Sequence, residues 1–132
     1  MIVLKTSREL SIMRKAGKIS QKALRLAGEA VEPGVSTWEI DKIVRQYIES
    51  EGATPSFLGY SGYPASACIS VNNVVIHGIP SKSTILKHGD IVSVDVGRFT
   101  KGSMATMPGP SPAGRSARKP GRFWKPQRRA CF

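Results

Sequence analysis

The 132-residue sequence contains two cysteines and no apolar run near the roughly 18 residues that a membrane-spanning helix requires. Cys68 and Cys131 are too few to form the disulfide framework of a small secreted domain, so we expect reduced thiols. The apolar start Met-Ile-Val-Leu ends at Lys5, which is too short for a secretory signal peptide. These absences predict a cytoplasmic chain with no membrane partner.

Acidic residues are absent from the last part of the chain. Residues 98–132 hold nine Lys and Arg and no Asp or Glu, a net charge of +9, whereas residues 1–97 hold 11 bases and nine acids, a net charge of +2. The basic segment also holds five of the nine prolines and shows no strand or helix period. We therefore expect it to be disordered, because it cannot bury enough surface to offset its ordering entropy. Such a tail either binds an anionic partner, such as nucleic acid or anionic lipid, or is an unstructured segment that has no specific binding partner.

Two segments have the pattern of capped amphipathic helices. Thr6-Ser7-Arg8-Glu9 and Ser36-Thr37-Trp38-Glu39 are capping boxes, in which a hydroxyl and a glutamate satisfy the first amides of a helix. Apolar residues follow each box at helical spacing, to about Ala30 in the first helix and to Gly52 in the second. Helices with one apolar face need a sheet or another helix to pack on.

Strand-like runs follow the second helix. Ala67–Val71 and Val74–His77 are two such runs, joined through the turn-prone pair Asn72-Asn73. A third run begins after Gly89-Asp90 and ends at Gly97. The order predicts an α/β (α+β) fold in which two amphipathic helices pack on a short antiparallel sheet.

Two of these runs carry a polar residue where an apolar one is expected. His77 ends the second run, and Asp95 lies on the strand face that also holds Ile91 and Ser93. An ionised carboxylate in a buried strand is costly unless it is paired, hydrogen-bonded or bound to a metal. The pattern alone leaves two interpretations of each residue: Asp95 is held by backbone donors or binds a metal, and His77 is a satisfied strand-end histidine or part of an active site.

The sequences around His77 and Asp95 are distinctive enough to indicate a protein family. Ser70 to Pro80 reads S-V-N-N-V-V-I-H-G-I-P, and Gly89 to Gly97 reads G-D-I-V-S-V-D-V-G. Both closely resemble type I methionine aminopeptidase, over residues 1–97. The resemblance implies that residues 1–97 form the N-terminal half of a pita-bread catalytic domain, and that residues 98–132 lie outside the likeness.

The resemblance also implies a chemistry. Enzymes of this family are metal-dependent hydrolases that remove N-terminal methionine from nascent proteins, with two divalent ions (cobalt, manganese, iron or zinc) held by two Asp, one His and two Glu. Asp95 matches the first metal ligand, and His77 matches the histidine that contacts the substrate and stabilises charge near the scissile bond. The resemblance further assigns the wall of the methionine pocket to Phe57, Tyr60, Tyr63 and Cys68, whose apolar and polarisable surfaces suit a thioether.

Most of the family's metal ligands have no counterpart in this sequence. We therefore expect a truncated, monomeric chain that binds no metal pair and is inactive. One alternative is a non-enzymatic fragment whose basic tail binds RNA or the ribosome. Another is a different member of the same superfamily, such as a proline dipeptidase, although the Asn-x-Val-x-x-His-Gly-Ile-Pro string argues against it.

The genetic code offers an explanation of the tail. Because Met and Trp each have one codon, back-translation from Gly102 constrains the bases, and reading two bases later permits F-H-G-D-N-A-R-T-F. The family carries F-H-G-D-x-A-R-T-F after Asp-Val-Gly, and its Asp is the second metal ligand. We therefore interpret residues 98–132 as the product of a one-frame slip after Gly97.

Overall fold

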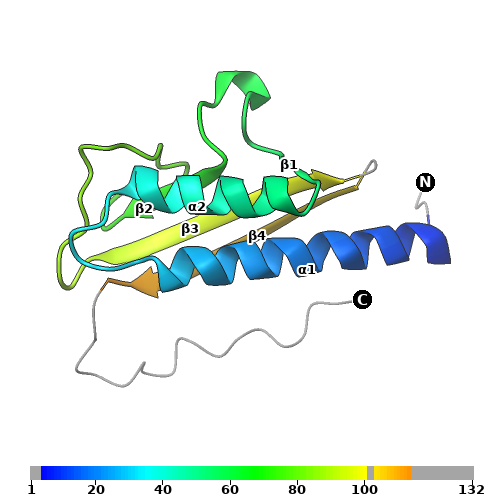
Figure 1. The fold of residues 1–132 in the computed structure, drawn as a ribbon, viewed down its shortest axis with the longest axis horizontal. Coiled ribbons are helices and arrows are strands. Elements are labelled where there is room, and N and C mark those ends of the chain that lie inside the picture. Colours follow the sequence, from blue (N-terminus) through cyan, green and yellow to red (C-terminus); the bar gives the residue numbers. More distant parts are fainter. Residues whose placement is uncertain (1–3, 101–102, 114–132) are drawn as a thin grey trace.

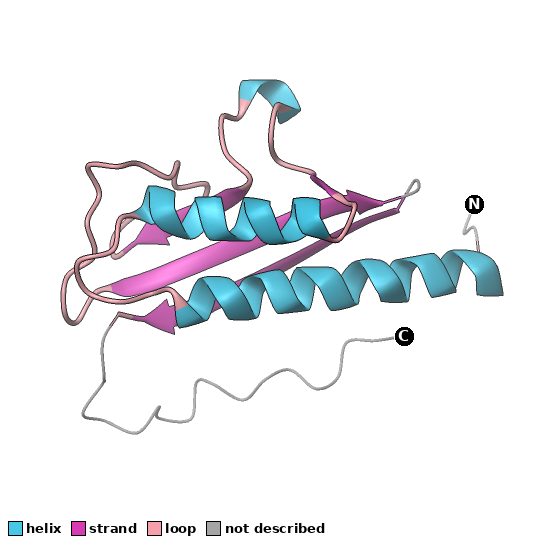
Figure 2. Cartoon of the chain, viewed as in Figure 1, coloured by secondary structure: helices cyan, strands magenta, loops and turns pink. Residues whose placement is uncertain are grey.

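The computed structural model describes residues 4–100 and 103–113. Helix α1 (Ser7–Glu29) and helix α2 (Thr37–Ser50) form one layer, and an antiparallel sheet forms the other (Figure 1). The two helices cover the same face of the sheet, as the helix and strand colours of Figure 2 show. This two-layer arrangement confirms the predicted fold class. In the described part of the chain, neither helix is apolar enough over sufficient length to cross a membrane.

Both predicted capping boxes are present. The Glu9 amide donates to Thr6 Oγ1 (3.3 Å), and the Thr6 amide donates to Glu9 Oε2 (2.7 Å). The Ser36 and Glu39 pair repeats the exchange at 3.2 and 2.8 Å. Each box satisfies amides of the first helical turn and fixes where the helix begins.

One long strand organises the sheet. β3 (Ile91–Thr100) pairs along its whole length with β4 (Ser103–Pro112), and its opposite edge pairs with β2 (Ala67–Val71) and the two-residue β1 (Thr54–Pro55). A short 3₁₀ turn, η1 (Tyr60–Gly62), lies between β1 and β2. All three pairings are antiparallel, as the sequence predicted.

The two faces of β3 have opposite environments. Val92, Val94 and Val96 are completely buried beneath the helices, whereas Ile91 is 64% exposed on the other face. The covered face and the helices form one apolar cluster. Its fully buried members are Ala23, Ala27, Ile40, Val44, Ile48, Ala67, Leu86, Val92, Val94 and Val96.

The predicted strand Val74–His77 is wrong. The segment is a loop in which Val75 is 86% and Ile76 67% exposed. Asn72 takes the left-handed turn conformation that its sequence predicted (φ 53°), but His77 does so as well (φ 56°). A positive φ turns the backbone out of the extended conformation of a strand. The segment contacts β2 again just after His77, where the Ile69 amide donates to the Gly78 carbonyl (2.8 Å).

The expectation of disorder is also wrong for residues 98–100 and 103–113, since β3 continues across Gly97 to Thr100 and β4 begins at Ser103. Pro108, Pro110 and Pro112 alternate along β4, so their nitrogens, which lack a hydrogen, lie on one side of a strand that pairs with β3 alone. An edge strand tolerates proline in this arrangement because no ladder bond is lost. The Ala113 amide then donates to the Asp90 carbonyl (2.9 Å). The rest of the predicted tail, residues 114–132, lies outside the described residues.

Candidate functional site

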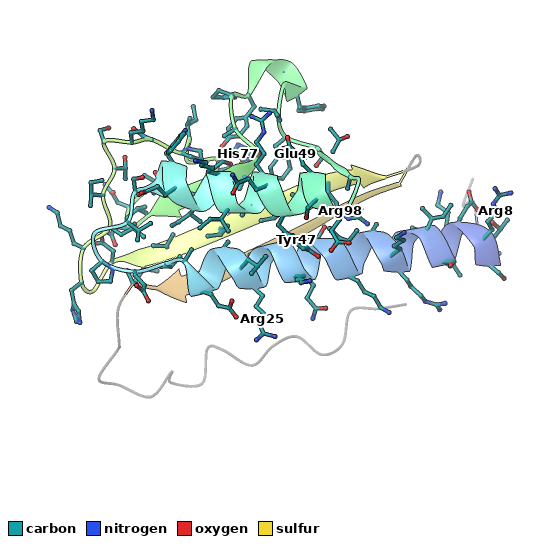
Figure 3. The ribbon with its side chains drawn as sticks, in the orientation of Figure 1. Arg8, Arg25, Tyr47, Glu49, His77 and Arg98 are labelled. Carbon is teal, nitrogen blue, oxygen red and sulfur yellow. The ribbon has the colours of Figure 1, made fainter. Side chains whose placement is uncertain are left out.

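A small pocket lies on the sheet face that the helices leave uncovered. Its volume is about 100 Å³. β2, the loop after it and β3 line the pocket with the following residues: Cys68, Ser70, Val75, Ile76, His77, Ser93 and Asp95. The structure therefore brings the two residues that the sequence singled out, His77 and Asp95, into one pocket. In the view of Figure 3, His77 lies to one side of α2, whereas Arg98 and Tyr47 lie to the other side, between the two helices.

Asp95 contributes a carboxylate that the fold leaves partly unsatisfied. It lies directly opposite Cys68 in the β2–β3 register, and its Oδ1 atom is buried with no hydrogen-bond donor among the described residues. Burial raises the pKa of Asp95, while the charge of His77 and the Val96 amide act in the opposite direction. Backbone donors therefore do not account for this oxygen. A buried carboxylate oxygen without a donor is suited to a divalent cation.

His77 is held at the pocket by the glycine that follows it. The Gly78 amide donates to Ser70 Oγ (3.1 Å), and the Gly78 carbonyl accepts from the Ile69 amide (2.8 Å). A Cβ at position 78 would collide with the backbone of Ile69, so glycine alone allows this close approach. The His-Gly pair of the sequence motif thus has a physical reason: glycine presses the loop against β2 and leaves His77 beside the pocket.

Cys68 supplies a buried thiol to the same pocket. Burial raises the pKa of Cys68, the nearby Asp95 charge raises it further, and a hydrogen bond with Tyr63 lowers it. The side chain is therefore a neutral thiol at pH 7, which forms an apolar, polarisable wall rather than a nucleophile. Cys131 lies outside the described residues.

The three aromatic residues predicted for the pocket wall do not line this pocket. Tyr60 is 74% exposed on η1, whereas Phe57 and Tyr63 pack edge to face with ring centroids 6.5 Å apart. The Tyr63 hydroxyl lies within hydrogen-bond distance of the carbonyls of Ala67 (3.0 Å) and Gly78 (3.1 Å). Tyr63 therefore positions the backbone on either side of the pocket. The assignment of these aromatics to a substrate pocket stays a prediction.

The sequence interpretation missed one buried carboxylate that positions the site. Asp41 of α2 is 8% exposed and accepts hydrogen bonds from the amides of Ser66 (2.8 Å) and Ala67 (2.7 Å). Burial raises the pKa of Asp41 despite these two bonds. The carboxylate anchors the start of β2, one residue before Cys68. Its position on the apolar stripe, three residues before Val44, was the signal available in the sequence.

Arg98 is a second buried ion, on the helix-covered face. Its exposure is 0%, and its Nε donates to the Ala16 carbonyl of α1 (2.6 Å). Burial lowers the pKa of Arg98, while Tyr47 and Glu51 act in the opposite direction. The sequence interpretation placed this residue at the start of a disordered tail, but it belongs to the packed part of β3.

The described residues supply little of a metal centre. No group of three or more His, Cys, Asp or Glu side chains lies close enough to hold an ion in residues 4–100 and 103–113. The unsatisfied oxygen of Asp95 fits one ligand of a divalent ion. One carboxylate provides too few donors for a pair of such ions, which take several oxygen or nitrogen ligands each.

Comparison with known proteins matches this chain to part of longer proteins. The model of metallopeptidase family M24 matches residues 11–107. A methionine aminopeptidase from Clostridium perfringens is 57% identical over 97 residues, which cover 74% of this chain and 39% of that protein. The methionine aminopeptidase structure from Thermotoga maritima superposes with a TM-score of 0.84 at 38% identity, covering 88% of this chain and 47% of the other. A Bacillus anthracis Xaa-Pro dipeptidase shares the fold at 23% identity and a TM-score of 0.70.

The resemblance seen in the sequence is therefore confirmed, and the chain spans less than half the length of these relatives. The family match extends from α1 into β4 and includes both His77 and Asp95. Because that match covers more than half of the sequence, the chain belongs to metallopeptidase family M24.

Proposed function

We propose that this chain is the N-terminal part of a methionine aminopeptidase, in which Asp95 is a metal ligand and His77 contacts the substrate. The observation that carries the proposal is the buried Asp95 oxygen without a donor, beside His77, on the open face of the sheet. The high identity to methionine aminopeptidases, compared with 23% to the dipeptidase, supports this choice within the family.

The residues of the pocket have separable roles in that reaction. Asp95 would hold divalent metal, which when bound activates a water and polarises the scissile carbonyl. His77 would donate a hydrogen bond to the substrate as negative charge develops. The neutral thiol of Cys68, with Val75 and Ile76, forms the apolar side of the pocket and suits the methionine thioether.

The 132-residue chain itself should not catalyse the reaction. The described residues place a single carboxylate in the pocket, and residues 98–132 contain no Asp or Glu that could add to it. The complete enzyme would act on the N-terminal methionine of nascent peptides in the cytoplasm, near the ribosome, with cobalt, manganese, iron or zinc.

A one-frame slip after Gly97 explains why the remaining ligands are missing. The shifted reading of Gly102 onward permits F-H-G-D-N-A-R-T-F, which contains a carboxylate. The structural support is that β3 crosses Gly97 without interruption and is followed by β4, so the shifted string would occupy a strand already paired with the strand of Asp95. Nucleotide sequencing across codon 97 tests this: codons incompatible with the shifted string would rule the slip out.

Activity of the frame-restored protein tests the assignment of Asp95 and His77. We expect it to release methionine from a Met-Ala-Ser peptide when cobalt or manganese is added, whereas the 132-residue chain does not. Asp95→Asn should abolish release, and His77→Ala should lower turnover while the protein still binds metal. Equal release by the Asp95→Asn variant would contradict the role of Asp95. Metal-dependent release by the 132-residue chain would contradict the proposed truncation.

A further inference from the structure

Helix α1 carries its positive charge on one side. All six of its basic residues are exposed, and at about 100° per residue they fall within an arc of about 120° around the helix. We call this set the cationic arc; its members are Arg8, Arg14, Lys15, Lys18, Lys22 and Arg25. The buried residues of α1 lie on the opposite side, against the sheet: Ala16, Ile19, Ser20, Ala23 and Ala27. The cationic arc therefore faces away from the core.

Acidic side chains neutralise little of this charge. Of the two acids of α1, Glu9 is engaged in the capping box, and Glu29 pairs with Arg25 at 2.8 Å. Arg25 is the one member of the cationic arc in an ion pair with a described residue, and the Lys22 ammonium lies 5.0 Å from the Tyr47 ring centroid.

Helix α2 shows that such an imbalance is not general in this fold. It holds two bases and three acids within Thr37–Ser50. Its Arg45 and Glu49 form an ion pair at 2.8 Å. The surplus of positive charge on the helix layer is therefore specific to α1.

The dimensions of the cationic arc suit a long, regular polyanion. Arg8 and Arg25 are 17 residues apart, which places their Cα atoms about 25 Å apart along the helix axis. A duplex of about seven base pairs has this length and presents phosphates along both strands. We propose that the cationic arc of α1 binds the phosphate backbone of double-helical nucleic acid, without reading its sequence.

The composition of the cationic arc disfavours an anionic membrane as the partner. A helix that lies in a membrane interface inserts an apolar face next to its basic one. In α1 the apolar face is packed on the sheet, and the apolar side chain within the arc, Leu26, is half-buried. The inference does not depend on the proposed peptidase activity, because the pocket of Asp95 lies on the other face of the sheet.

Two matched triple variants of the full chain test the proposal. Arg14→Gln, Lys15→Gln and Lys18→Gln remove three charges from the cationic arc, whereas Lys42→Gln, Lys82→Gln and Lys87→Gln remove three exposed charges elsewhere. Both variants keep residues 98–132, so the basic tail contributes equally to each. Binding to a fluorescent 20-base-pair RNA duplex is measured by anisotropy across a salt series, and thermal melts by circular dichroism confirm that both variants fold.

We expect the cationic-arc variant to bind about tenfold more weakly, with a salt slope reduced by about two to three, and the control to change less than about twofold. Equal weakening of both variants, or no weakening of either, would overturn the proposal, because binding would then follow net charge or the tail alone. Binding to phosphatidylserine vesicles that depends on the arc, without duplex binding, would identify a membrane partner and also overturn it.

Discussion

The two faces of β3 differ in burial and in the hydrogen bonds that their polar side chains make. On the covered face, Val92 and Val94 are fully buried and the buried Arg98 donates to a carbonyl of α1. On the open face, Ile91 is largely exposed and Asp95 retains a buried oxygen without a donor among the described residues. The covered face is thus a packed core, whereas the open face holds an exposed apolar side chain and a carboxylate oxygen without a described donor. The residues that stabilise the fold and the residues of the pocket thus lie on opposite faces of the same strand.

The largest expected effect comes from deleting apolar volume in the core between the helices and the covered face of β3. Ile40→Ala, at a fully buried position, should lower the free energy of unfolding by about 3 kcal/mol because it leaves a cavity. The matched change Ile91→Ala, at a position that is 64% exposed, should lower it by less than about 0.5 kcal/mol. Urea denaturation of both variants measures the difference, and similar losses would show that the open face is covered in solution.

The second-largest loss of stability is expected at Asp41, whose carboxylate connects α2 to the start of β2. Asp41→Ala removes the acceptor of the Ser66 and Ala67 amides and should cost about 2 kcal/mol. Hydrogen exchange should become faster at these two amides and at the start of β2. Unchanged protection there would mean that β2 does not depend on this carboxylate.

Replacing Asp95 should have a smaller effect, and it should raise the stability of the chain rather than lower it. The pKa of Asp95 is raised above the ordinary value of 3.8, so the native state binds more protons than the unfolded state just above that pH. Stability therefore falls as the pH rises through this window, and at pH 7 the ionised group is unfavourable. Asp95→Asn should therefore stabilise the 132-residue chain at pH 7, because it removes the buried charge.

Thermal melts of this variant between pH 4 and pH 7 test the sign. The pH dependence should decrease but not vanish, because burial raises the pKa of Asp41 as well. Destabilisation by Asp95→Asn at pH 7 would show that the carboxylate is already satisfied by donors in this chain.

The smallest effect is expected in the exposed loop after β2. Ile76 is 67% exposed, so Ile76→Ser should change the free energy of unfolding by less than about 0.5 kcal/mol. It should also reduce self-association in analytical ultracentrifugation, since an exposed apolar side chain favours aggregation. A loss of stability above 1 kcal/mol would place Ile76 in a packed environment.

Local chemistry made the helices and β3 predictable from the sequence. The capping boxes at Thr6 and Ser36 and the alternation of β3 need no information beyond neighbouring residues, and all three were confirmed. The Asn-x-Val-x-x-His-Gly-Ile-Pro string identified the family, and the structure brings its histidine to Asp95.

Features that depend on tertiary contacts were not predictable in the same way. The run Val74–His77 has strand composition, but close packing of Gly78 on Ile69 turns it into a loop. The prolines of β4 suggested disorder, because their alternation matters only once a partner strand lies on one side. Asp41 is recognisable as an anchor only when β2 lies at the end of its side chain.

Metal titration by calorimetry tests the central claim most directly, that Asp95 is one ligand of a site completed by residues absent from this chain. Manganese is added to three proteins: the 132-residue chain, the frame-restored protein and the frame-restored Asp95→Asn variant. The account predicts saturable binding by the restored protein and none by the other two. Equal binding by the restored protein and its Asp95→Asn variant, or saturable binding by the 132-residue chain, would contradict it.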